Sequence, residues 1–222
     1  MSVRTLMAGL MAPLLLAAPA LAFDQAELDA FLAEGECFGC DLTEADLAGA
    51  QLADSYLTYS DLSRADLTGA DLSESYIRFA VLEGTDLTGA NLEQSNMWDA
   101  RMRGAIFAGA NVSGGSIQGA TLSNADFSGA VLTGINGVNA NLRAADLTDA
   151  DLTEADLTGA TLRGAILVGA RLTGAILVNT GFAGADLSGA DLTGAVLDSA
   201  LPADAILCNT ILPDGATEDR DC

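Results

Sequence analysis

The chain has 222 residues without lysine or histidine, and its 31 acidic residues outnumber nine arginines to give a formal net charge of −22. Such a charge repels bare nucleic acid and anionic membrane, so neither is an expected partner. Half of the residues are hydrophobic but only 5% are aromatic, which indicates a core of small aliphatic side chains.

The first 22 residues resemble a secretory signal peptide. Arg4 supplies the positive start, an apolar run covers Leu6–Leu16, and Ala20-Leu21-Ala22 has the small–x–small pattern of a cleavage site. The run is shorter than the ~20 residues of a membrane span, which favours cleavage between Ala22 and Phe23 over an uncleaved anchor. The mature chain then has eight arginines against 31 acidic residues, a net charge of −23. We expect it in the periplasm or outside the cell, with no membrane insertion.

Residues 23–36 predict a short helix. Asp24 is a favourable N-cap, Gly35 ends the pattern, and Leu28, Phe31 and Leu32 fall on one side. We expect that apolar side to cover the first coil of the structure that follows.

A five-residue repeat occupies the chain from residue 37 to about residue 200, with a last irregular coil over 201–222. Of the 35 positions at every fifth residue from Leu42 to Leu212, 33 hold Leu, Ile, Val, Met or Phe. The residue two places earlier is small in 34 of 35 cases. A period of five matches neither the 3.6 of a helix nor the 2 of a strand, so the chain must turn a corner in each repeat.

Segments such as 145–159, ADLTDADLTEADLTG, resemble the A-(D/N)-L-x-x motif of the pentapeptide-repeat family. The resemblance covers about residues 40–212. It implies an all-β fold, a right-handed quadrilateral parallel β-helix with four pentapeptides in each coil. With roughly nine coils at one strand spacing per coil, the rod would be ~40 Å long.

Four cysteines lie near the two ends of the repeat. Their positions along the chain favour disulfides Cys37–Cys40 and Cys208–Cys222, the second joining the tail to the last coil. Cys37-Phe38-Gly39-Cys40 also has the C-x-x-C spacing of redox pairs and of half a zinc site, but the chain lacks a βαβ context and further ligands. We expect neither a metal site nor a cofactor.

With four pentapeptides per coil, each residue lies above its equivalent four repeats earlier, which places aromatic residues and one arginine on one side of the rod. Tyr56 stacks under Tyr76, Tyr59 under Phe79, and Arg78 under Trp98, with Asp54, Glu74 and Asp99 around them. Clusters of this kind are typical of protein-binding hot spots, although ring ladders also stabilise stacked coils. We keep both interpretations.

Two further surface features follow from the same spacing. Aspartates align in columns, as in Asp46, Asp66 and Asp86, where corner hydrogen bonding is a better explanation than cation binding. Polar residues are replaced in later coils by Ile166, Val168, Ile176, Val178 and Val196. If exposed, these residues would form one apolar patch suited to a homodimer or to a partner protein; the alternative is that the tail covers some of them.

One local defect interrupts the pattern, since Gly137 holds a large inward position and Ile135 a small one. We expect a bend or an exchange of volume between them.

A straight rod with solvated carboxylates offers no cleft for acid–base chemistry, so we expect no enzyme and no catalytic residue. The main hypothesis is an exported scaffold that binds an unidentified protein partner through Tyr56, Tyr59, Tyr76, Arg78, Phe79 and Trp98. The family resemblance supplies an alternative, because some members resemble B-form DNA and act on type II topoisomerases. A structural envelope protein without a ligand is the third.

Overall fold

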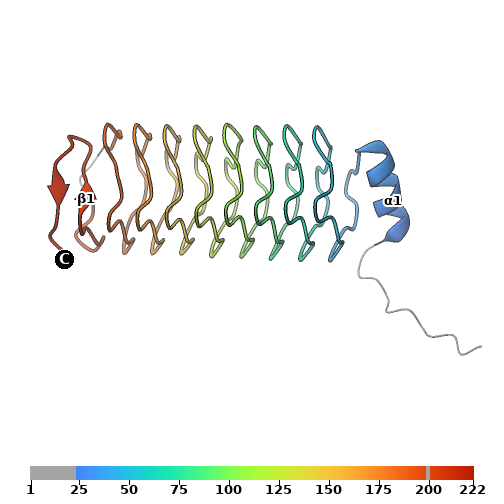
Figure 1. The fold of residues 1–222 in the computed structure, drawn as a ribbon, viewed down its shortest axis with the longest axis horizontal. Helices are drawn as coiled ribbons and strands as arrows, with labels where there is room; N and C mark the ends of the chain where they lie inside the picture. The colour runs from blue at the N-terminus through green and yellow to red at the C-terminus, as the bar shows by residue number, and fades with distance from the viewer. Residues whose placement is uncertain (1–23, 199–200) are drawn as a thin grey trace, which may run out of the picture.

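The computed structural model describes residues 24–198 and 201–222, so the predicted leader and its cleavage site at Ala22 and Phe23 lie outside the described residues. The described chain forms a straight rod of stacked coils, with helix α1 (Gln25–Glu34) at one end (Figure 1). The other end holds the two short strands β1 (Thr210–Ile211) and β2 (Thr217–Glu218).

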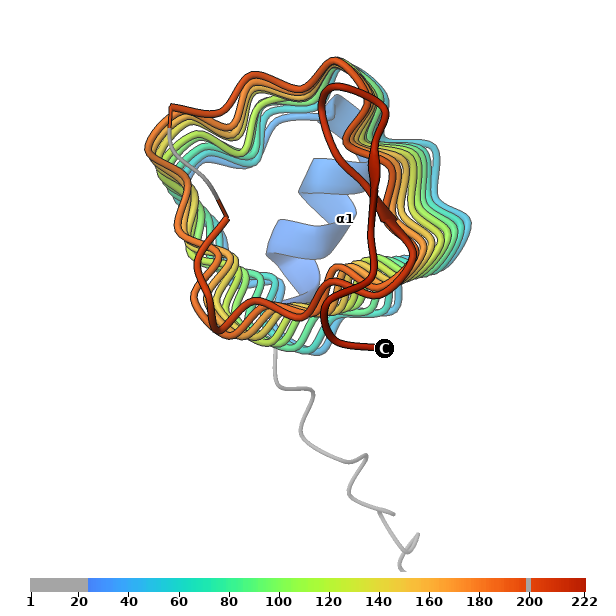
Figure 2. The same ribbon diagram turned by 90° about the vertical axis from the view of Figure 1, so that its left-hand side faces the viewer.

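Each coil consists of four pentapeptides, as predicted. Isolated parallel bridges join residues to their equivalents four repeats later, from Glu36 with Tyr56 to Asp191 with Ile211. They form four columns, one for each side of the coil, and the coils superimpose when the rod is viewed along its axis (Figure 2). Each side contributes a single bridging residue per coil, which is why the β-helix contains almost no extended strand.

Each corner is a tight turn. The carbonyl of Leu42 accepts a hydrogen bond from the N–H of Ala45 at 3.2 Å, and Glu44 between them has φ of 60°. A positive φ at the third residue is the requirement of a type II turn, which glycine and asparagine meet at least cost. We call this third residue the corner position; it lies two places after each large inward residue.

The core is a column of alternating large and small side chains. The inward residues at every fifth position from Leu42 to Leu192 are buried, and all of them are large except Gly137; alanines fill most small positions. Burying one leucine contributes ~2 kcal/mol, and nearly every pentapeptide repeats this contribution. Stacking of the coils, with backbone hydrogen bonds between them, therefore stabilises the rod along its length.

The space at Gly137 is filled by side chains of the neighbouring coils, and the exchange of volume with Ile135 stays a prediction. Ile135 is fully buried, and a side chain built on Gly137 would meet Leu157 Cδ2 at 2.7 Å. The bridges through Asn136 to Ser116 and Asp156 continue without interruption.

Helix α1 covers the first coil with a narrower face than predicted. Leu28 and Phe31 are buried, but Leu32 is 52% exposed, so its inclusion in the covering face was wrong. Leu32 follows Phe31 by one residue and therefore points about 100° away from it around the helix. The Asp24 carboxylate accepts hydrogen bonds from the N–H groups of Ala26 and Glu27, as expected for an N-cap.

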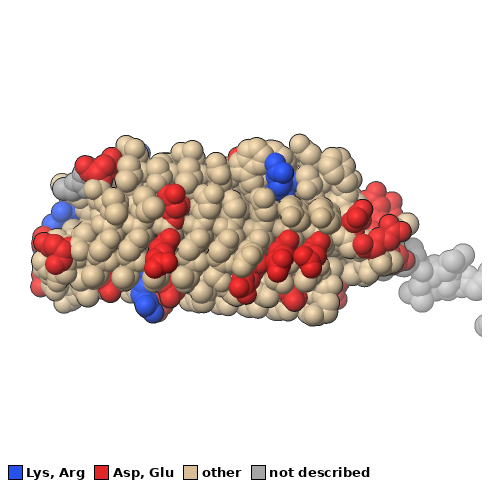
Figure 3. Space-filling view, turned by 90° about the horizontal axis from the view of Figure 1, so that it is seen from above, with Lys and Arg blue, Asp and Glu red and all other residues tan. Residues whose placement is uncertain are grey.

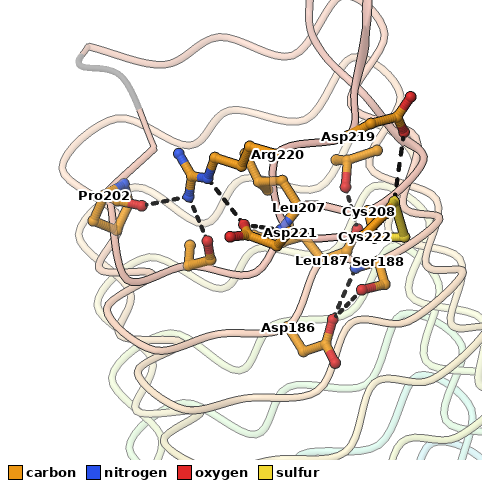
Figure 4. Close-up of polar contacts among 12 residues, drawn as sticks. Asp186, Leu187, Ser188, Pro202, Leu207, Cys208, Asp219, Arg220, Asp221 and Cys222 are labelled. Carbon is orange, nitrogen blue, oxygen red and sulfur yellow. Dashed lines mark hydrogen bonds and ion pairs between the residues drawn. A yellow bond between two sulfur atoms is a disulfide. The ribbon is translucent and has the colours of Figure 1, made fainter.

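The C-terminal end departs from the regular coil. Gly181 has no bridge to residue 201, but bridging resumes at Ile206 and Ile211. Strand β2 pairs antiparallel with β1 and covers its outer edge. Arg220 donates to the carbonyls of Pro202 and Ala205, while the Asp221 carboxylate accepts the N–H of Leu207 at 2.9 Å (Figure 4).

Both predicted disulfide pairings are present. Cys37 is joined to Cys40 beside the first coil, and Cys208 is joined to Cys222 in the tail. Within the described residues, no helix is long and apolar enough to cross a membrane.

Candidate functional site: the aromatic face

Six rings lie on one side of the first coils, and together with Arg78 they form a surface that we call the aromatic face. Its rings belong to Phe38, Tyr56, Tyr59, Tyr76, Phe79 and Trp98. The parallel bridges from Glu36 through Tyr56 and Tyr76 to Asn96 fix the coils in this register. The structure thus brings together all the residues that the sequence placed in the candidate site.

The rings stack along the rod axis. Tyr56 lies on Tyr76 and Tyr59 on Phe79, each pair with centroids 4.9 Å apart and ring planes within 7°. Trp98 lies next to Phe79, with ring centroids 5.0 Å apart and ring planes tilted by 58°. Each stacked pair adds about 0.5–1.5 kcal/mol beyond the area it buries, so the ladder also stabilises the coils.

Arg78 is held against the rings. Its guanidinium carbon lies 4.7 Å from the centre of the Trp98 ring and 5.6 Å from that of Phe79, both within cation–π range. The Arg78 Nε atom is buried and has no hydrogen-bond partner. The predicted acidic neighbours Asp54, Glu74 and Asp99 are exposed, and none of them forms an ion pair with Arg78.

Two of the rings occupy the corner position, which favours glycine. Tyr59 has φ of 65° and Phe79 has φ of 58°. For a residue with a bulky side chain this conformation costs about 1–2 kcal/mol. Elsewhere in the rod most corner positions hold glycine, asparagine or an acidic residue. The two rings therefore stand where backbone stability alone would not place them.

The stacking decides which part of the rings meets solvent. Tyr59 lies between Phe38 and Phe79, and Phe79 lies between Tyr59 and Trp98, so neighbouring rings cover part of each of these two rings. Tyr56, Tyr59 and Tyr76 are nevertheless 50%, 53% and 42% exposed. The aromatic face consequently leaves about half of each tyrosine open for contact with protein side chains.

The sequence reasoning missed Phe38. This ring is 78% exposed and meets Tyr59 edge to face at a centroid distance of 5.3 Å. Phe38 lies one coil before Thr58 and two coils before Arg78 in the same column. The coil spacing could therefore have placed Phe38 on the aromatic face. The Cys37–Cys40 disulfide closes the short loop that carries this ring.

The acidic columns exist and serve the corners. Asp46, Asp66 and Asp86 bridge in order. Figure 3 shows one face of the rod, on which acidic side chains lie in several groups. The Asp66 Oδ1 atom accepts the N–H of Thr68 at 3.0 Å, and the hydrogen bonds with Thr68 lower the pKa of this carboxyl. Among the described residues, no group of three or more acidic or cysteine side chains could hold a metal ion.

The apolar residues of the later coils do not form the single patch that we expected. The bridges place Ile166 in the column of Asp146 and Asp186, whereas Ile176 pairs with Val196 in another column. Val168 lies on the same side as Ile166, and Val178 lies on the same side as Ile176, so these two valines are also on different sides of the coil. Ile166, Ile176 and Val196 remain exposed, so the tail does not cover them.

Two small hollows lie at the C-terminal end. Both are lined largely by apolar residues; Leu197 and Leu201 line both hollows, and Leu207 lines one. Each hollow has a single carboxylate in its lining, Glu218 in one and Asp198 in the other.

Comparison with known proteins agrees with this architecture. The pentapeptide-repeats family model matches in eight copies over residues 36–73, 85–124, 116–159 and 155–194. No match was found among curated proteins.

Solved structures of pentapeptide-repeat proteins also match. The heterocyst differentiation regulator HetL from Nostoc sp. strain PCC 7120 is 34% identical over 82% of this chain and 87% of its own, with a TM-score of 0.34. QnrB1, a plasmid-mediated fluoroquinolone resistance protein, is 21% identical over 74% of this chain and 90% of its own, with a TM-score of 0.55. The family model alone covers more than half of the sequence, and the chain belongs to the pentapeptide-repeat family.

Proposed function

We propose that this protein is an exported, non-enzymatic scaffold that binds a partner protein through the aromatic face. The observation that carries the proposal is the placement of Tyr59 and Phe79 at positive-φ corner positions. A glycine or an asparagine there would relieve the backbone, so the rings are costly for the fold and useful on a binding surface. Exposed aromatic residues beside an arginine have the composition of interface hot spots.

The competing explanation is that the rings only reinforce the stack. Stacking does offset part of the backbone cost, but it does not require Tyr56, Tyr59 and Tyr76 to remain about half exposed. Phe38 supports the binding hypothesis further, because it is the most exposed of the six rings and ends the ladder beside α1.

The test replaces both corner rings by asparagine, a residue that this chain already tolerates at the same position. Asn124, Asn139 and Asn179 have φ between 56° and 58°. The double variant Tyr59→Asn/Phe79→Asn should therefore fold as well as the wild type. In crosslinking pull-downs from the native envelope fraction, its capture of partners should fall at least about tenfold, the effect of losing a hot spot.

The matched control is Gln94→Asn, a change at a corner position on another side of the rod, where φ is 56°. It should capture the same partners as the wild type. If the double variant also captures them undiminished, the rings are only a structural ladder and the protein has no binding role on this face.

A second candidate function rests on the acidic columns. Vertical pairs such as Asp126 with Asp146 give this rod the charge expected of a DNA mimic that acts on a type II topoisomerase. The shared fold with QnrB1 permits this candidate but does not extend that protein's activity to this chain. An excess of the mature protein that leaves gyrase supercoiling unchanged would remove it. The predicted leader favours the scaffold, and cell fractionation tests the leader.

A further inference from the structure

The arginines are unevenly distributed over the four sides of the rod. Five of the eight arginines in the described part of the chain lie on the side that follows the aromatic face in each coil: Arg64, Arg101, Arg103, Arg143 and Arg163. The bridging column from Asp61 through Arg101 and Asn141 to Gly181 defines this side. On a protein with a net charge of −22, such segregation is unexpected.

Arg64 and Arg101 are neutralised within the rod. Arg64 pairs with Glu44 and Arg101 with Glu83, each at 2.7 Å. No carboxylate lies within ion-pair distance of Arg103, Arg143 or Arg163 in the described residues, and all three side chains are exposed. We call these three residues the arginine row.

Backbone hydrogen bonds hold the arginine row in line. The N–H of Gly104 donates to the carbonyl of Ser123, that of Asn124 to Arg143, and that of Ala144 to Arg163, at 2.9 to 3.1 Å. Coils repeat at about 4.8 Å, so Arg143 and Arg163 are neighbours and the whole row spans about 14 Å.

The segments of this side around the row carry no acidic residue. Residues 100–104, 120–124, 140–144, 160–164 and 180–184 contain only arginine, small, polar and apolar residues. By contrast, the face in Figure 3 shows many carboxylates and few cations. Neighbouring guanidinium groups repel one another unless an anion lies between them.

We propose that the arginine row binds a short acidic segment of a partner protein in an extended conformation. At about 3.4 Å per residue, four or five extended residues match the 14 Å of the row. Guanidinium groups bind carboxylates in bidentate geometry, which suits aspartate and glutamate side chains. This proposal concerns another side of the rod and does not depend on the aromatic face.

The surroundings of the row favour a short ligand over a long polyanion. Glu83 occupies the position of Arg103 one coil earlier, and Asp61 lies on the same side beyond it. A nucleic acid or a long acidic polysaccharide would run past the row onto these carboxylates and would be repelled. A segment of a few acidic residues fits on the row without reaching these carboxylates.

The experiment measures fluorescence anisotropy of a labelled peptide of six glutamates with the disulfide-bonded protein. It is done at about 0.1 M salt, where the Debye length of about 10 Å screens the acidic sides but leaves direct contacts. The wild type should bind saturably, and Arg143→Gln/Arg163→Gln should weaken binding at least about tenfold.

The matched control is Arg64→Gln/Arg171→Gln, which changes the net charge equally but removes arginines paired with Glu44 and Asp151. It should change the affinity less than about threefold. Equal losses in both variants would reduce the effect to net charge and overturn the proposal, as would a wild type that does not bind.

Three further measurements test the identity of the occupant. Thermal unfolding of both double variants should match that of the wild type, which separates binding from folding. Tighter binding of a single-stranded DNA or a sulfated oligosaccharide of equal charge would refute the acidic peptide. Self-association of the wild type that disappears in Arg143→Gln/Arg163→Gln would assign the row to a second copy instead.

Discussion

The predicted exchange of volume between Ile135 and Gly137 gives the sharpest test of how the repeat specifies the core. Ile135→Ala restores the small residue of the repeat but leaves the space of a buried side chain empty. Such truncations cost about 2–5 kcal/mol, and a site with a glycine beside it has little to fill the gap, so we expect about 3 kcal/mol.

The second single variant, Gly137→Leu, restores the large residue. Its Cβ alone would meet Leu157 Cδ2 at 2.7 Å and Ile117 Cδ1 at 3.6 Å, so the leucine overpacks a filled core. Overpacking costs about 1–3 kcal/mol. Both variants bring the sequence closer to the repeat, and both should destabilise the rod.

If volume is exchanged between the two sites, Leu157 and Ile117 can shift toward the space that Ile135 vacates, and the double variant Ile135→Ala/Gly137→Leu admits the leucine. It should lie within about 1 kcal/mol of the wild type, which corresponds to a favourable coupling of about 4 kcal/mol between the two sites. Urea unfolding followed by circular dichroism gives the four stabilities of the cycle. Additive losses would refute the exchange of volume and would mean that each residue packs independently.

Three other predictions concern the corners and the tail. Phe79→Asn should change the stability by less than about 1 kcal/mol in thermal unfolding, because relief of the positive φ offsets the lost ring contacts, whereas Phe79→Val should destabilise. Hydrogen bonds from Ser73 lower the pKa of the Asp71 carboxyl in the folded protein. The ionised carboxylate therefore stabilises the fold above its ordinary pKa of 3.8, and this stability is lost as the pH falls through the lowered pKa of the folded state. Asp71→Asn keeps the acceptor, as Asn91 does one coil later, and its thermal midpoint should fall less between pH 7 and pH 3. Cys222→Ser should cost up to about 3 kcal/mol, seen as faster hydrogen exchange in residues 205–222 with no change near residue 100.

The repeat predicted the fold well because the requirement of each position recurs many times. A large residue at every fifth place and a small one two places earlier are geometric conditions of a coil that turns four corners. The structure confirms the coil of four pentapeptides and therefore the stacking of Tyr56 with Tyr76 and Arg78 with Trp98.

The errors and omissions fall where the period stops or where side chains meet diagonally. Leu32 belongs to a short helix, in which burial depends on how the helix docks and not on the repeat. Phe38 contacts Tyr59, which lies one position beyond its equivalent in the next coil, so comparing only equivalent positions left this contact out. Ile166 and Ile176 are close in sequence but lie on different sides of the coil.

The same regularity explains why function must be sought in the outward side chains. Residues such as Tyr59 and Arg143 project from corners and sides whose backbone groups are already bonded to the next coil. Their replacement therefore leaves the hydrogen bonds between coils intact. A rod of this kind can carry an aromatic face in its first coils and an arginine row on the adjacent side, and neither surface alters the backbone that supports the other. Each surface can accordingly be removed by substitution while the other keeps its geometry, which is the condition that the proposed binding experiments require.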